Sequence, residues 1–188
     1  TDDEFTTNGS FWDSGNKGGS LMSKNPTQGN STIVHTSNGK SAELKSQFIG
    51  VLSFGQFAAG NLYAGQFGEL QGMDGASIYF GQPFNSRPSA LHGWFNYTSG
   101  KIDYRGSNTP EGVGIKGTDD LCSIYIALSK EKILIDNTDI STFPDWETDK
   151  RIIAYSRMDD ADAVTTNGWK EFTLDFKNRS LEPLDTYY

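Results

Sequence analysis

Cysteine is almost missing from this chain, because Cys122 is the only one among 188 residues. A single cysteine excludes a disulfide within the chain and a zinc site built on a cysteine cluster. Cys122 opens a stretch of alternating residues, so we expect it to be a small buried strand residue. Histidine is also scarce. His35 and His92 lie far apart, which argues against a transition-metal site and favours a structural role for each.

Long apolar runs and clusters of positive charge are missing as well. No segment approaches the roughly 18 apolar residues that a membrane-spanning helix requires. No basic segment followed by an apolar one opens the chain, so we expect any signal peptide to be absent or already removed. The formal net charge is −8 and the basic residues are scattered, which argues against nucleic acid as a partner. Motifs of serine hydrolases and phosphate-binding loops do not occur.

Glycine and aromatic residues are plentiful, with 21 glycines and 13% aromatics beside only 35% hydrophobic residues. Alternation predicts strands at Gly93–Thr98, Cys122–Leu128 and Trp169–Phe176, the last with its phenylalanines and leucine facing inward. No window predicts a long amphipathic helix. Many short strands between glycine-rich turns predict an all-β fold, either a sandwich or a barrel. The long loops favour a jelly-roll β-sandwich over an immunoglobulin-like one.

The chain is expected to form one domain. The polar residues 1–10 are interpreted as an N-terminal arm or boundary, and residues 11–188 as the jelly-roll β-sandwich domain. Ser107–Thr118 and Thr138–Lys150 are the longest polar connections, and loops of this length are often functional.

Two central blocks, Phe57–Phe67 and Ile78–Asp103, resemble the bacterial putative carbohydrate metabolism domain (PCMD) family. Phe11–Asn16 and Gly168–Phe176 add to this resemblance, which covers nearly the whole chain. It implies a jelly-roll β-sandwich similar to galactose-binding domains and carbohydrate-binding modules. It also implies an extracytoplasmic protein, secreted or at the cell surface or outer membrane, in gut anaerobes that use polysaccharides. The implied partners are a poly- or oligosaccharide and other domains of the same surface protein.

The chain departs from the family at its C-terminal end. Family members continue with further strands where this chain stops, at Asp185–Tyr188. A sandwich without these strands would expose a sheet edge and part of its core. We therefore expect the biological protein to be longer than this chain.

Sugar binding requires flat rings that stack on pyranose faces and planar polar groups that bind hydroxyls. Trp94 and Trp169 lie in alternating strands, so we expect both rings in the core. Trp146 lies in a polar loop, where its ring either covers the core or forms an exposed platform. The candidate ligand-binding residues are Trp12, Asp13, Asn16, Arg87, His92 and Trp146.

The polar candidates have structural alternatives. Arg87 either binds sugar hydroxyls or a uronate, or holds its loop through backbone carbonyls. Asp119 and Asp120 are candidate ligands of a structural calcium ion, the only cofactor considered, although solvated turn carboxylates are the favoured interpretation. A second acidic group follows at 159–162.

Three functions remain open at this point. The favoured one is a non-catalytic carbohydrate-binding module. A glycoside hydrolase would need two facing carboxylates, and the loops offer several without a spacing that selects a pair: Glu111, Asp119, Asp120, Asp145 and Glu147. A structural or adhesive module that displays other domains is the third.

Overall fold

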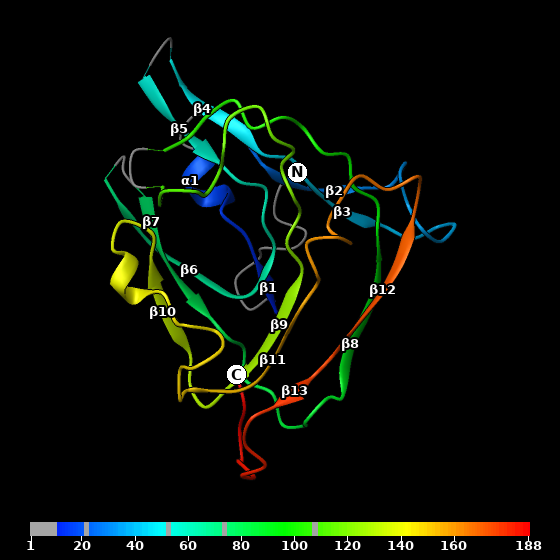
Figure 1. The fold of residues 1–188 in the computed structure, drawn as a ribbon, viewed down its shortest axis with the longest axis vertical. Coiled ribbons are helices and arrows are strands. Elements are labelled where there is room, and N and C mark those ends of the chain that lie inside the picture. The colour runs from blue at the N-terminus through cyan, green and yellow to red at the C-terminus, as the bar shows by residue number, and fades with distance from the viewer. Residues whose placement is uncertain (1–10, 21–22, 52–53, 73–74, 107–108) are drawn as a thin grey trace. The chain divides into compact units, whose positions relative to one another are not determined.

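The computed structural model describes residues 11–20, 23–51, 54–72, 75–106 and 109–188. The predicted N-terminal arm, 1–10, lies outside these residues. The all-β prediction is confirmed: the described residues form several antiparallel strand pairs, and their helices are short, α1 at Asn16–Ser20 and η1 at Ile140–Thr142 (Figure 1). The Ser14–Asn16 turn signal leads directly into α1, where the Gly18 N–H donates to the Gly15 carbonyl.

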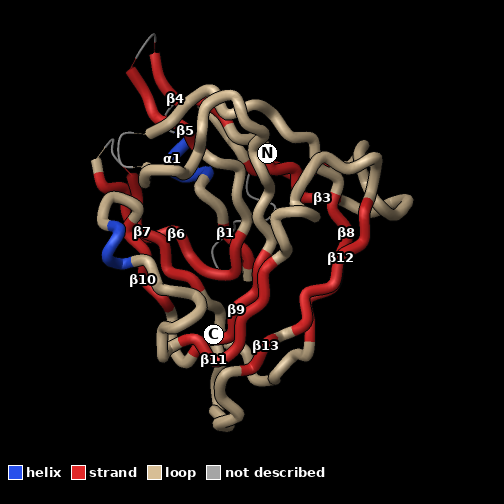
Figure 2. Tube along the Cα trace, viewed as in Figure 1, coloured by secondary structure: helices blue, strands red, loops and turns tan. Residues whose placement is uncertain are grey.

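The chain divides into two compact units. Unit 1 comprises the described parts of Thr1–Asn85, Ser129–Asp145 and Leu184–Tyr188, and unit 2 comprises those of Ser86–Leu128 and Trp146–Pro183. In both units the strands are connected by turns and loops with almost no helix (Figure 2).

Unit 1 is built on a four-stranded sheet of order β1-β6-β7-β10, whose strands are β1 (Trp12–Asp13), β6 (Tyr63–Gln71), β7 (Gly75–Phe80) and β10 (Ile133–Asp136). Two strand pairs complete it: β2 (Thr27–Asn30) with β3 (Ser41–Leu44), and β4 (Gln47–Val51) with β5 (Phe54–Ala58). Side chains alternate across the sheet, so Tyr63, Ile133 and Ile135 are buried on one face while Leu134 is exposed on the other.

Unit 2 has a three-stranded sheet of order β13-β11-β9 and a two-stranded sheet of β12 and β8. These strands are β8 (Ala90–Phe95), β9 (Tyr125–Ser129), β11 (Ile152–Arg157), β12 (Lys170–Asp175) and β13 (Lys177–Asn178). The central strand β11 is buried from Ile152 to Ser156 because it has neighbours on both sides. Phe95, Met158, Ala163 and Leu174 form a core cluster.

Cys122 is half-buried and packs against this core cluster. The predicted inward residues of Trp169–Phe176 are confirmed, since Leu174 and Phe176 are buried and Phe172 packs on the cluster. The prediction that Trp94 lies in the core is wrong: 41% of Trp94 is exposed. Its neighbour Phe95 takes the inward position, and alternation along β8 then turns Trp94 outward. Trp169 is half-buried.

Candidate functional site

The outer face of the β8–β12 sheet places an exposed aromatic ring beside polar planar groups. Trp94 lies directly opposite Glu171, and His92 lies opposite Thr173. Directly opposed residues of an antiparallel pair share one face, so these four side chains lie on the same side of the sheet. The other face is the one that packs on the core cluster.

Close contacts fix the side chains on this face relative to one another. The His92 Nε2 and Glu171 Oε1 atoms are 2.6 Å apart, a hydrogen-bond distance for either protonation state of the imidazole. The imidazole stands edge-on to the Trp94 ring, with 4.6 Å between centroids and 81° between planes. His92 therefore links the carboxylate to the indole. We define the Trp94 face as His92, Trp94 and Glu171.

The backbone beneath the Trp94 face is set by a glycine. Gly93 holds the inward-facing strand position between His92 and Trp94. The Phe172 ring packs against it so closely that a Cβ there would lie 3.0 Å from the ring. Phe95 on the same strand meets Phe172 edge-on, with 6.0 Å between ring centroids. The inner packing thus fixes the register that brings Trp94 and Glu171 together.

This arrangement has the chemistry that carbohydrate recognition needs. The indole offers a flat apolar surface for the C–H face of a pyranose, and imidazole and carboxylate offer donors and acceptors for hydroxyls. Because these groups lie on strands rather than loop tips, little order has to be gained on binding.

Trp146, predicted as a ligand contact or a cover, lies elsewhere in unit 2. Its ring stacks on Tyr155, with 5.9 Å between centroids and 14° between planes, and it also contacts Tyr125. Tyr155 is only 8% exposed, so the half-buried indole covers a core residue. Its packing agrees with the predicted alternative of a cover.

Two other candidates, Asp13 and Asn16, belong to a buried polar network in unit 1. The Asp13 carboxylate accepts hydrogen bonds from the backbone N–H groups of Ser14 and Phe67, at 2.8 and 2.7 Å. The Asn16 side chain donates to the Thr27 carbonyl at 2.6 Å and accepts from the Thr27 N–H at 3.0 Å. These contacts occupy both side chains with backbone groups, so we leave them out of the proposed site.

Trp12 and Arg87 differ in their surroundings. Trp12, on β1 of unit 1, is 42% exposed and meets Phe11 edge-on. Arg87 in unit 2 donates a short hydrogen bond to the Ser180 carbonyl. This is the predicted structural alternative, in which the guanidinium holds a loop through a backbone carbonyl.

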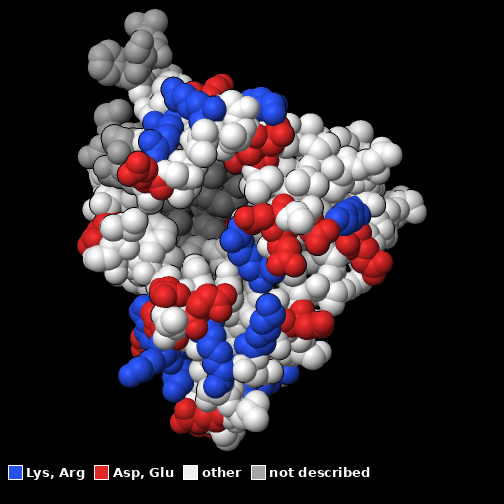
Figure 3. Space-filling model, viewed as in Figure 1, with Lys and Arg blue, Asp and Glu red and all other residues white. Residues whose placement is uncertain are grey.

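The acidic residues lie next to basic ones, as the mixture of colours in Figure 3 illustrates. Four ion pairs in unit 2 have N–O distances of 2.6–2.7 Å: Lys101–Asp119, Arg151–Asp149, Arg157–Asp160 and Lys170–Asp162. Asp119 thus faces a lysine, and Asp120 accepts hydrogen bonds from Tyr97 and Ser99 only through its backbone carbonyl. The described residues contain no group of three or more His, Cys, Asp or Glu side chains arranged for a metal ion.

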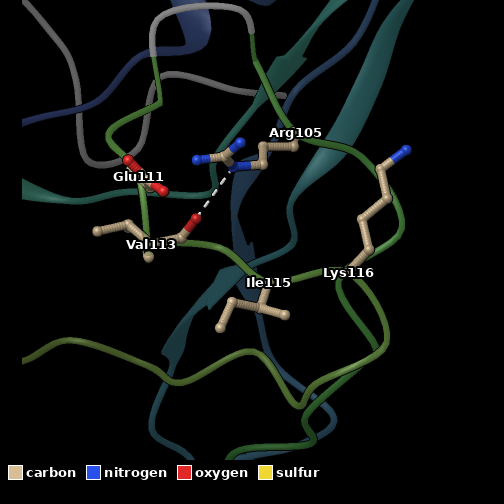
Figure 4. Close-up of a pocket in the computed structure, with 6 residues that line it drawn as sticks. Arg105, Glu111, Val113, Ile115 and Lys116 are labelled. Atoms are coloured by element: carbon tan, nitrogen blue, oxygen red, sulfur yellow. Dashed lines mark hydrogen bonds between the residues drawn. The ribbon is translucent and has the colours of Figure 1, made fainter.

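A depression of about 400 Å³ lies in the loop that follows β8. Figure 4 shows the Arg105 side chain reaching the Val113 carbonyl, to which its Nε donates at 3.0 Å. Arg105 also donates to the carbonyls of Thr109 and Pro110, so this side chain holds the loop in shape. Its described lining has no aromatic ring for a sugar and consists of Arg105, Glu111, Gly112, Val113, Ile115 and Lys116.

Fold and site define an all-β domain with an exposed aromatic and polar sheet face. The chain belongs to the family described as "Putative carbohydrate metabolism domain", whose model matches residues 1–188. The resemblance seen in the sequence is thereby confirmed, and the chain is a domain related to carbohydrate metabolism. Among the described residues, no helix has the length and hydropathy to cross a membrane.

Two crystal structures are similar to this chain. One, described as a putative glycoside hydrolase from Bacteroides thetaiotaomicron VPI-5482, has a TM-score of 0.66 and 26% identity over 93% of this chain and 50% of its own. The other, described as a putative glycoside hydrolase from Bacteroides vulgatus ATCC 8482, has a TM-score of 0.68 and 23% identity, covering 92% and 69%. This chain thus spans half the length of the first. No curated protein matches the sequence.

The sequence predicted His92 as a ligand-binding residue, but it did not single out Glu171 as one and it assigned Trp94 to the core. The outward position of Glu171 was readable from alternation in Trp169–Phe176. Its proximity to His92 was not, because the two residues are 79 positions apart and meet only through the β8–β12 register.

Proposed function

We propose that this domain binds carbohydrate without cleaving it, through the Trp94 face. The observation that carries the proposal is an indole 41% exposed on a regular strand, with a hydrogen-bonded His92–Glu171 pair beside it. An exposed indole beside a hydrogen-bonding pair offers both surfaces that a pyranose can use, and family membership points to a sugar.

The proposal includes an extracytoplasmic location. A polymeric glycan supplied from outside the cell does not cross a membrane unaided, so a module that binds such a glycan would act outside the cytoplasm. A single ring and one polar pair make few contacts, so we expect a dissociation constant in the millimolar to micromolar range. Linkage to further domains would raise the effective affinity.

Cleavage is the second candidate, because the similar structure from B. thetaiotaomicron is described as a putative glycoside hydrolase. Hydrolysis requires two carboxyl groups about 5 to 10 Å apart, one of which has a raised pKa. Asp149, which is not among the carboxylates considered from the sequence, does not suit a general acid, because the Arg151 guanidinium that hydrogen-bonds to it lowers its pKa. Asp119, Asp160 and Asp162 each form an ion pair with a lysine or arginine, which weighs against a catalytic role for these carboxylates.

The test is retention on a glycan array or in affinity electrophoresis, with Trp94→Ala and Trp12→Ala as a matched pair. The two rings are almost equally exposed, at 41% and 42%, but lie in different units. We expect Trp94→Ala to weaken binding about tenfold or more and Trp12→Ala to leave it unchanged.

Each other outcome is informative. Loss of binding in Trp12→Ala alone would move the site to β1. A wild-type protein that binds no glycan would overturn the proposal. New reducing ends after incubation with the bound glycan would replace binding by hydrolysis.

A further inference from the structure

We infer that the Trp94 face selects glycans that carry a positively charged amino group. This inference rests on the proposed function and names its ligand class. It follows from the charges that share the face with the exposed indole.

The outward side chains of the β8–β12 sheet are acidic overall. Glu171 lies opposite Trp94, and Asp175 lies opposite Ala90 on the same face. His92 is the single basic residue among the outward strand positions of β8 and β12. Lys170 of β12 is held by Asp162, with 2.7 Å between Nζ and Oδ1.

Glu171 retains capacity for a ligand. Its Oε1 atom meets His92, while its Oε2 atom accepts no hydrogen bond from any residue that the structure describes. The side chain is 63% exposed, against 45% for His92. This exposed carboxylate belongs to the residue paired with Trp94, whose strand lies about 5 Å away, measured between backbones.

An ammonium group satisfies both neighbours at once. It is attracted to the face of an indole by the negative charge of the ring centre, and its three N–H donors suit a carboxylate oxygen. A neutral hydroxyl or acetamide makes only the hydrogen bond. A sugar carboxylate is repelled by Glu171 and Asp175, and the net charge of −8 on the chain repels it further.

His92 limits the position of the ligand. Because the imidazole makes a T-shaped contact with Trp94 and is bonded to Glu171, it fixes the carboxylate beside the indole. The ammonium group would then meet Oε2 of that carboxylate and the exposed part of the indole. The assay belongs at a pH at which the ligand amine is protonated.

The experiment compares two oligosaccharides of equal length and linkage, one of glucosamine and one of N-acetylglucosamine, by isothermal titration with the protein. We expect the amino oligomer to bind about tenfold more tightly, with the preference falling as salt is raised. Glu171→Gln, which keeps the shape but removes the charge, should abolish most of the preference, and Asp175→Asn should reduce it less. Glu131→Gln, an equal charge change in unit 1, should leave it intact.

The results separate this inference from the proposed function. Equal affinity for the two oligomers, tighter binding of the acetylated one, or a preference that survives Glu171→Gln would overturn the inference while binding stands. Binding of other array glycans but neither oligomer would also overturn it. A protein that binds nothing on the array overturns both.

Discussion

The Trp146 ring stacks on the Tyr155 ring in unit 2, with 14° between the two planes. The Arg179 guanidinium also lies over Tyr155, at 5.9 Å from the centroid of the ring. Tyr155 is thus contacted by an indole and a cation, and only 8% of it remains exposed. This packing gives Trp146 a structural task that is separate from the Trp94 face.

Replacing Trp146 should cost stability rather than binding. Trp146→Ala uncovers Tyr155 and removes the ring contacts, so we expect a loss of about 2 kcal/mol in the free energy of unfolding, below the range for fully buried rings. Trp146→Phe keeps a stacking ring and should recover about half of that loss. Urea unfolding followed by circular dichroism measures both. If Trp146→Ala kept its stability yet lost glycan retention, the binding site would lie on this loop.

Asn16 should be needed for folding of unit 1. Its side chain satisfies both backbone groups of Thr27, and both residues are buried, at 6% and 2% exposure. Asn16→Ala leaves a buried N–H and a buried carbonyl without partners, which costs about 2 to 4 kcal/mol. The exposed Asn178, changed to alanine, provides the control with little expected effect. An Asn16→Ala protein of unchanged stability that no longer binds sugar would return this residue to the ligand candidates.

The sequence predicted the inward faces where one face of a strand is plainly apolar. Phe172 and Leu174 alternate with polar residues, and their burial followed from this pattern alone. Around Trp94 the pattern fails because Trp94 and Phe95 are both aromatic, so either ring could face the core. The choice is made by Phe172, which packs against Gly93 from the partner strand. That contact joins residues 79 positions apart and cannot be read locally.

The turn residues show the same limit of prediction from local sequence. Asp13 follows Trp12 among polar residues, and this setting made it a ligand-binding candidate. It is buried because the Phe67 N–H, 54 positions away, donates to it. Local chemistry identified the groups able to bind a ligand, whereas long-range pairing decided which of them remain accessible.

Cys122 should react slowly with alkylating reagents in the folded protein. Burial raises the pKa of its thiol, and the nearby Asp120 carboxylate adds to the effect. A raised pKa lowers the thiolate fraction at pH 8, and only the thiolate attacks. We expect alkylation about tenfold slower than in 8 M urea, with the rate curve moved to higher pH. A folded-state rate equal to that of the unfolded chain would contradict the burial of this thiol.

Asp149 should stabilise the fold at neutral pH and lose this effect in acid. The Arg151 side chain donates to its carboxylate at 2.6 and 3.1 Å and lowers its pKa. Because the pKa is lower in the folded than in the unfolded chain, the stabilisation is complete above the unfolded value of about 4 and disappears as pH falls through the folded value.

Asp149→Asn keeps an acceptor for the Arg151 N–H but removes the charge, so we expect a loss of about 1 kcal/mol at pH 7. The difference from wild type should shrink below pH 4, because the wild-type carboxyl is then protonated as well. Asp119→Asn, which removes a largely exposed ion pair with Lys101, should change stability little at any pH. Urea unfolding at pH 7, 5 and 3 gives the comparison. A difference independent of pH would assign the loss at Asp149 to packing and not to charge.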